Sequence, residues 1–250
     1  MTTVSEDRAK AAQAALGGLY PHLAARGESA GAAHDAGAAP RLEAALCEAM
    51  VAKWRDSVAV KARFFESRGA DVLRAAHLLA DSFRNGGRLY TMGNGGSSCD
   101  AAHVAVEFQH PVTAGRPALP AHNLAQDMAM LTAVGNDVGF AEVFARQMPG
   151  LLRPGDVALG VSTSGNSANV LRGLEAAHEL GARTLVLVGG DGGAMARSPS
   201  VELCLLVESD SIHRIQETHV AIYHVLWDLV HSLLADDRPA RAAAPPRRAK

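Results

Sequence analysis

The segment MGNGGSSCDAAHVAVE (residues 92–107) combines two kinds of residue that could do chemistry. Its glycines lie within residues 93–98, the first loop, where they permit positive φ angles and let backbone N–H groups approach an anion. His103 and Glu107 follow at positions i and i+4, which places both on one face of a helix. Because Glu107 follows three apolar residues, we expect it to be largely buried, and a buried carboxylate needs a partner or a function. The segment is therefore compatible with a nucleotide loop, a metal site or a tight turn before a helix.

A second hydroxyl-rich stretch, STSGNS at residues 162–167 (the second loop), also precedes a helical pattern. Its hydroxyl groups and backbone amides could bind a phosphate monoester without a lysine. The alternative is a turn with an N-cap, but one cap needs only one hydroxyl. Four hydroxyls in six residues therefore favour phosphate binding, through Ser162, Thr163, Ser164 and Ser167. A nicotinamide or nucleotide site is disfavoured, because neither G-x-G-x-x-G spacing nor a P-loop motif occurs.

The last helical segment, at 211–235, carries Gln216 and His224 eight residues apart, so these two share a face. Glu217 and His219 point elsewhere. A lone histidine on an apolar helix is usually a core residue. Its pairing with Gln216, and with a second helix that carries histidine and glutamate, favours a site.

Short apolar runs alternate with helical segments, which predicts parallel βαβ units in a doubly wound α/β fold with a five-stranded sheet. Ligands of such sheets bind at the carboxyl ends of the strands, where both loops are expected. We expect strands at 88–92, 119–124, 156–161, 184–188 and 201–207. Helices are expected at 41–68, 71–83, 97–108, 126–134, 167–180 and 211–235, with a short turn near 193–197.

Composition predicts three regions. Residues 1–40, rich in alanine and glycine, are expected to form a partly disordered extension with a short helix at 7–16. Residues 41–235 are expected to form the folded domain, led by a helical hairpin. Residues 236–250 are expected to be a disordered basic tail, which is interpreted as solubilising rather than as a contact for an acidic partner.

The chain as a whole gives no reason to expect nucleic-acid or membrane binding. Its formal net charge is -2 and its hydrophobic fraction is 48%. No apolar run approaches about 18 residues, and the polar N-terminal segment has no secretory pattern. The three cysteines, Cys47, Cys99 and Cys204, lack metal-type spacing and are expected to be reduced thiols of a cytoplasmic protein.

Five motifs occur together in order: GNGGSSCDAAHVAVE, AVGNDVGF, LGVSTSGNSANV, VGGDGG and RIQETHVAIYH. Through them, residues 41–235 resemble the SIS (sugar isomerase) domain proteins, and among these the phosphoheptose isomerases. That family converts sedoheptulose 7-phosphate to D-glycero-D-manno-heptose 7-phosphate. The resemblance implies a flavodoxin-like sheet and a homotetramer whose N-terminal helices pack in a bundle and whose site lies at a subunit interface.

The resemblance also implies a set of site residues. It implies one Zn²⁺ per subunit, held by His103, Glu107, Gln216 and His224. It implies a sugar site and a phosphate site, with Glu107 as the base and His224 as the complementary acid/base of an enediolate mechanism. The implied sugar contacts are Asn94, Gly95, Gly96, Asn136, Asp137 and Gln216, the implied phosphate contacts are Ser162, Thr163, Ser164 and Ser167, and Ser97 would assist either.

The sequence departs from the family after the Glu107 helix. Basic residues expected there are replaced by Gln109-His110-Pro111-Val112, and Arg116 is the first cation. Three alternatives stay open: a non-catalytic SIS protein that binds the replication initiator DnaA, an SIS isomerase for another phosphosugar, and a sugar-phosphate sensor. The first lacks the catalytic glutamate and histidine, which this chain has.

Overall fold

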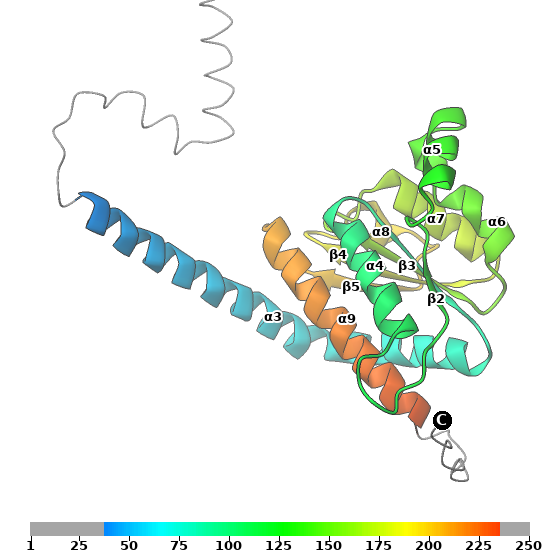
Figure 1. Ribbon diagram of the computed structural model, residues 1–250, viewed down its shortest axis with the longest axis horizontal. Coiled ribbons are helices and arrows are strands. Elements are labelled where there is room, and N and C mark those ends of the chain that lie inside the picture. The colour runs from blue at the N-terminus through cyan, green and yellow to red at the C-terminus, as the bar shows by residue number, and fades with distance from the viewer. Residues whose placement is uncertain (1–37, 236–250) are drawn as a thin grey trace, which may run out of the picture. The chain divides into compact units, whose positions relative to one another are not determined.

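A computed structural model describes residues 38–235 (Figure 1). The predicted extension at 1–40, with its helix at 7–16, lies outside this range except for its last three residues, and so does the tail at 236–250. The chain divides into two compact units with a boundary between Lys53 and Trp54. None of the described helices combines the length and apolar character that crossing a bilayer requires.

A single helix, α3 (Ala38–Arg84), replaces the two helices predicted at 41–68 and 71–83, so the predicted helical hairpin is wrong. A break was expected around Gly69. A glycine inside a helix costs only about 1 kcal/mol relative to alanine. Burial of Phe64 on one side of Gly69 and of Val72 on the other outweighs that cost. The stop signal predicted after the helix is confirmed, because Gly86 follows at φ 78°.

The centre of the fold is a five-stranded parallel sheet in the order β2-β1-β3-β4-β5. All five predicted strands are confirmed, with ends that differ by a few residues. The sheet order reverses between β1 and β3, so the loops that follow these two strands leave the sheet side by side; Gly93 is in register with Val161. The strands are β1 (Leu89–Gly93), β2 (Ala121–Asn123), β3 (Val157–Ser162), β4 (Arg183–Gly189) and β5 (Leu203–Val207).

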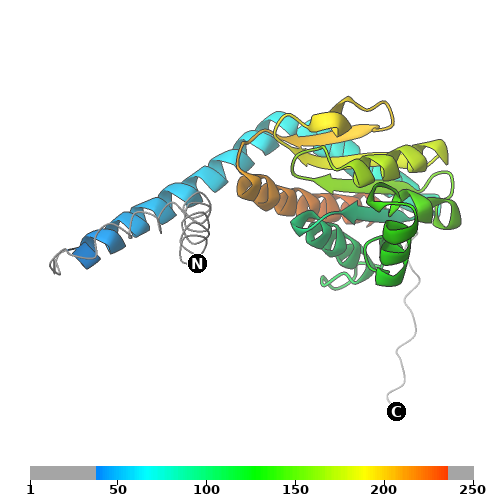
Figure 2. The same ribbon diagram turned by 90° about the horizontal axis from the view of Figure 1, so that it is seen from above.

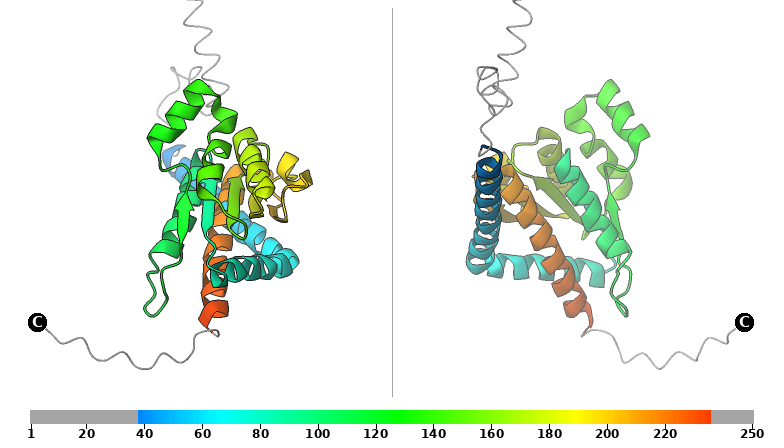
Figure 3. Two further views of the ribbon diagram at one scale, coloured as in Figure 1. Left: turned by 90° about the vertical axis from the view of Figure 1, so that its right-hand side faces the viewer. Right: turned by 60° about the vertical axis from the view of Figure 1, so that its left-hand side comes forward.

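Helices cover both faces of the sheet, as a doubly wound fold requires (Figure 2). Part of α3, from Val60 on, packs on one face with α4 (Gly96–Gln109) and α9 (Ile212–Ala235). On that face α4 and α9 lie next to each other (Figure 3). The other face is covered by elements that lie between β2 and β5: α5 (Met128–Asp137), α6 (Met148–Leu151), α7 (Ala168–Glu179) and α8 (Gly193–Arg197).

The predicted helices after β1 are confirmed, with ends that shift by up to three residues. Three short elements were not predicted: the 3₁₀ turns η1 (Phe140–Glu142) and η2 (Ala145–Gln147), and α6. Each is only one turn long, so it contains too few residues for a helical period to appear in the sequence.

Candidate active site

The first loop leaves β1 and enters α4 through glycines that are required either by a positive φ angle or by close contacts. Gly95 precedes the first residue of α4 and has φ 53°, a conformation that favours glycine. A Cβ on Gly93 would lie 2.4 Å from the carbonyl oxygen of Ser97. The amide of Ser98 donates back to the carbonyl oxygen of Gly95 at 3.0 Å, which closes the turn. The prediction of a tight glycine turn at the start of a helix is confirmed.

The second loop leaves β3 and enters α7. Ser162 is buried, and its hydroxyl accepts a hydrogen bond from the amide of Gly165 at 3.1 Å and lies 3.1 Å from the Ser167 hydroxyl. Ser167 precedes α7 but makes no side-chain cap, so the N-cap interpretation has no support. Thr163 is half-buried and Ser164 is exposed, which leaves both side chains near the loop surface.

A partly buried amide pair joins the first loop to the start of α7. Asn94 and Asn169 exchange two side-chain hydrogen bonds, at 2.7 Å from Asn94 to Asn169 and at 2.8 Å in return. The carbonyl oxygen of the Asn169 side chain also accepts from the Val170 amide at 3.0 Å. Asn169 was not predicted, because an asparagine in the first turn of a helix carries no signal about a partner 75 residues away.

The turn after β4 and the start of α8 brace the second loop. The carbonyl oxygen of Gly165 accepts from the amide of Met195 at 3.0 Å, and the side chain of Asn166 accepts from the amide of Ala194 at 2.9 Å. Gly165 itself has φ 64°, and a Cβ there would lie 2.0 Å from the carbonyl oxygen of Gly192. The approach of two backbones thus fixes the conformation of the second loop.

Three predicted residues from two helices form one group, which we call the His–Glu–His group: His103 and Glu107 of α4 and His224 of α9. Each offers one ligand atom, and these atoms lie within 4.8 Å of one another. Nε2 of His103 lies 3.1 Å from a carboxylate oxygen of Glu107. The rings of His103 and His224 are 5.2 Å apart, nearly perpendicular.

The His–Glu–His group fits a divalent metal. Two imidazole nitrogens and one carboxylate oxygen are ordinary zinc ligands at about 2.0–2.2 Å, and atoms this close can surround one ion. Nδ1 of His103 lies 2.8 Å from the hydroxyl of Tyr223, a partner that leaves Nε2 facing Glu107. Burial raises the pKa of the Tyr223 phenol, so Tyr223 stays neutral. Tyr223 was not predicted.

Gln216, the fourth predicted ligand, lies beside the start of α4. A Cβ on Gly96 would lie 2.3 Å from the side-chain nitrogen of Gln216. The side-chain amide of Gln216 also hydrogen-bonds to the carboxyl of Asp100. Gln216 and His224 are eight residues, or about 12 Å, apart along the axis of α9. The described contacts of Gln216 are therefore with the start of α4, and its membership of the metal group stays a prediction.

Asp100 was not predicted and lies in the buried face of α4, one turn before His103. Asp100 as a whole is 9% exposed, and its Oδ2 is buried with no hydrogen-bond partner among the described residues. Burial raises the pKa of the Asp100 carboxyl, while the charge of His103 and the hydrogen bond from Gln216 oppose that rise. An aspartate in an apolar helix face is the signal that could have identified it.

Two further predicted residues lie apart from these contacts. Asn136 and Asp137 are the last residues of α5 and are exposed. The Asn136 amide donates to the Asp137 carboxylate at 2.7 Å. Their assignment to the sugar site stays a prediction.

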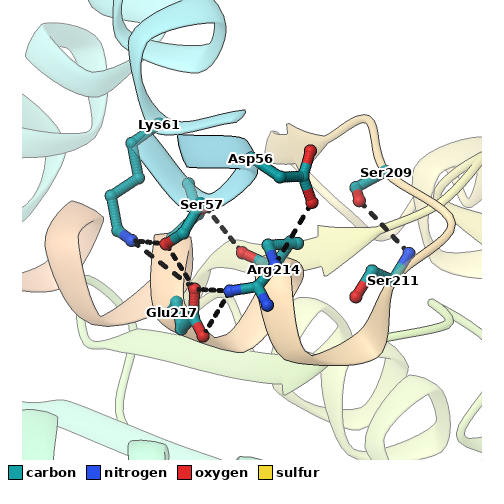
Figure 4. A network of polar contacts seen from close by, with 8 residues as sticks. Asp56, Ser57, Lys61, Ser209, Ser211, Arg214 and Glu217 are labelled. Carbon is teal, nitrogen blue, oxygen red and sulfur yellow. Dashed lines mark hydrogen bonds and ion pairs between the residues drawn. The ribbon is translucent and has the colours of Figure 1, made fainter. Parts of the chain in front are cut away.

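The prediction that Glu217 and His219 point away from the Gln216 face is confirmed. His219 is fully buried, and its Nε2 donates to the carbonyl oxygen of Val188 at 3.2 Å. Burial lowers the pKa of His219 to about 4, so it is a neutral core histidine. Glu217 accepts hydrogen bonds from Ser57 of α3 and from Arg214 (Figure 4).

The same polar network fixes the start of α9. Arg214 also contacts the carboxylate of Asp56 with its Nε at 3.2 Å, and Lys61 lies 3.7 Å from Glu217 (Figure 4). Residues of α3 therefore hold the turn of α9 that carries Gln216.

Comparisons with known proteins agree with this geometry. The family model of the SIS domain matches residues 53–189. The chain is 48% identical over 171 residues to the phosphoheptose isomerase of Chlorobaculum parvum, covering 67% of this chain and 81% of that relative. It is 44% identical over 203 residues to that of Chlorobaculum tepidum, covering 79% and 93%.

A solved structure gives the same result. The phosphoheptose isomerase of Neisseria gonorrhoeae superposes with a TM-score of 0.70 at 37% identity, covering 75% of this chain and 99% of that one. The chain therefore belongs to the SIS domain family and, within it, to the phosphoheptose isomerases.

Proposed function

We propose that this chain is an aldose–ketose isomerase that converts sedoheptulose 7-phosphate to D-glycero-D-manno-heptose 7-phosphate through an enediolate. The observation that carries the proposal is the convergence of His103, Glu107 and His224 from two neighbouring helices. Two members of this group lie on α4, the helix that begins at the first loop, and the hydroxyl-rich second loop leaves the neighbouring strand.

The reaction moves one hydrogen between two neighbouring carbon atoms, which requires a base, an acid and stabilisation of a developing oxyanion. In the proposed mechanism Glu107 takes a proton from C1 of the ketose. His224 moves a proton from the C1 hydroxyl to the C2 oxygen, and Glu107 returns its proton to C2. The aldose results with no net gain or loss of atoms. Zinc bound by His103, Glu107, Gln216 and His224 would polarise the carbonyl group and orient the hydroxyls.

The two loops, together with the end of α5 and the start of α9, are proposed to hold the rest of the substrate. The second loop presents the side chains of Thr163 and Ser164 near its surface just before the N-terminus of α7, where the helix dipole favours an anion. Phosphate binding is assigned to this loop, including Ser162 and Ser167. Sugar hydroxyls are assigned to the residues implied by the family resemblance: Asn94, Gly95, Gly96, Ser97, Asn136, Asp137 and Gln216.

A homotetramer with the site at a subunit interface is proposed for the assembly. Support comes from large apolar side chains of α3 that are exposed in the single chain and recur every fourth residue. In the first unit these are Leu42, Leu46 and Met50, and in the second they are Trp54 and Val58. Such residues along a helix are typical of an interface with another helix.

A cytoplasmic location is also proposed. Its support is the presence of three cysteines that are all free, Cys47, Cys99 and Cys204. The folded domain is proposed to span residues 41–235.

The test is turnover of sedoheptulose 7-phosphate by the purified protein, followed by NMR, before chelation, after chelation and after zinc is restored. Glu107→Gln should lower kcat by about 10²- to 10⁴-fold with an unchanged circular dichroism spectrum. Glu66→Gln, which removes an exposed carboxylate of α3, is the matched control and should keep full activity. Full activity in Glu107→Gln would refute the mechanism.

The same assay separates the alternatives. A panel of five- to seven-carbon ketose phosphates would identify an isomerase for another phosphosugar. A protein that is inactive on all of them but binds DnaA would be a scaffold. The presence of both Glu107 and His224 in one group favours the enzyme.

A further inference from the structure

The C-terminal end of α4 lacks one of its backbone donors. Glu107 lies in the last turn of this helix, and its carbonyl oxygen would pair with the amide of residue 111 if the helix continued. Residue 111 is a proline and has no N–H group. The neighbouring carbonyls are satisfied: that of Val106 accepts from His110 at 2.8 Å, and that of Phe108 accepts from Leu119 at 2.8 Å.

The indole of Trp227 supplies the missing donor. Its Nε1 donates to the carbonyl oxygen of Glu107 at 2.8 Å, across 120 residues of sequence. Trp227 belongs to α9 and is only 9% exposed, and this hydrogen bond is partly buried. A side chain of the helix that carries His224 therefore caps the turn that carries Glu107.

The indole is itself held in place. The guanidinium carbon of Arg116 lies 4.5 Å from the centre of the Trp227 ring, a cation–π contact. The same guanidinium donates to the carboxylate of Asp228 at 2.5 Å. On the indole itself, the centre of the His231 ring lies 4.9 Å from the centre of the Trp227 ring. Arg116, the first cation after Glu107 in the sequence, therefore packs on the indole of Trp227.

We propose that Trp227 is a positioning residue for Glu107, with Arg116 fixing the indole. This inference rests on the proposed function, in which Glu107 is the base and a metal ligand. Helix ends fray unless their carbonyls are paired. Without the indole N–H, the last turn of α4 would loosen and the carboxylate would lose its place beside His103 and His224. A misplacement of about 1 Å can cost about 100-fold in rate.

The test compares two aromatic substitutions that each remove one hydrogen bond to a main-chain carbonyl. Trp227→Phe keeps the buried ring and removes the N–H. Tyr90→Phe, the matched control, removes an O–H that donates to the carbonyl of Leu151 at 2.9 Å, away from the His–Glu–His group. Both variants should lower the thermal midpoint by a similar amount, which separates a structural effect from a positioning effect.

Three measurements are made on each full-length variant: kcat and KM with sedoheptulose 7-phosphate, zinc affinity by calorimetry, and hydrogen exchange in the last turn of α4. Trp227→Phe should lower kcat and zinc affinity by about tenfold, leave KM within about twofold, and speed exchange in that turn. Tyr90→Phe should change none of these beyond about twofold. Equal effects of the two variants would overturn the inference.

The outcomes also separate this inference from the proposed function. If the wild-type protein turns over no phosphosugar, the proposed function fails, and exchange in the last turn of α4 still decides whether Trp227 fixes it. If Trp227→Phe does not fold, Arg116→Gln replaces it and should produce the same changes at smaller size. Unchanged exchange in Trp227→Phe, or in Arg116→Gln where that variant replaces it, would refute the positioning role.

Discussion

Replacing Gly165 with alanine tests the idea that close backbone contact shapes the second loop. Gly165 has φ 64°, and its Cα faces the carbonyl oxygen of Gly192 in the loop after β4. An alanine Cβ would lie 2.0 Å from that oxygen, much closer than the van der Waals contact of ordinary Cβ atoms. Because the obstacle is backbone and not a flexible side chain, the two loops must separate.

A matched glycine isolates the contact from the backbone conformation. Gly190 has φ 67°, and nothing lies within 4 Å of a Cβ built on it. Gly190→Ala should therefore lower the free energy of unfolding only by the cost of holding alanine in the left-handed conformation, about 1–2 kcal/mol. Gly165→Ala should cost that amount plus about 1–3 kcal/mol for the collision. The entropy that alanine removes from the unfolded chain is common to both variants.

The measurement is urea-induced unfolding of both variants and the wild type, followed by circular dichroism, with KM for the phosphosugar measured in parallel. Gly165→Ala should be the less stable variant and should show a raised KM, because the loop proposed to bind the phosphate is displaced. Equal losses of stability in the two variants, with equal KM values, would refute the claim that the Gly165–Gly192 contact sets the loop.

Two further predictions concern single side chains. Ser164→Ala should raise KM by about tenfold with kcat nearly unchanged, because it removes one exposed hydroxyl donor. Steady-state kinetics of this variant and of Ser198→Ala, the control, would test the prediction. An unchanged KM in Ser164→Ala would contradict it. His219 has a folded-state pKa of about 4, below its unfolded value, so its contribution to stability is present above about pH 6.5 and is lost as the pH falls towards 4. Unfolding free energies should fall by about 2 kcal/mol more between pH 7 and pH 5 in the wild type than in His219→Gln, and parallel curves would contradict this reading.

The sheet and most helices were predictable because their signals are local. Each strand is a short apolar run and each helix has its own period, so neither requires knowledge of a distant partner. The one wrong element, the hairpin around Gly69, shows the limit of a local signal: burial of Phe64 and Val72 decided the outcome. Of the predicted site residues, His103 and Glu107 share a face because of their helical spacing, and the packing of α4 against α9 brings His224 beside them.

The residues that sequence reasoning missed share a different property: their role depends on a partner far along the chain. Asn169 matters because it faces Asn94, and Trp227 matters because Pro111 leaves the Glu107 carbonyl without an amide. Nothing in the type of either residue reveals that partner. Pro111 does offer a partial signal, since a proline four residues after a functional helical residue predicts an unpaired carbonyl that something else must satisfy. A search for such vacant backbone acceptors, followed by a search for buried donors on the facing helix, would have found Trp227 once the pairing of α4 with α9 was known.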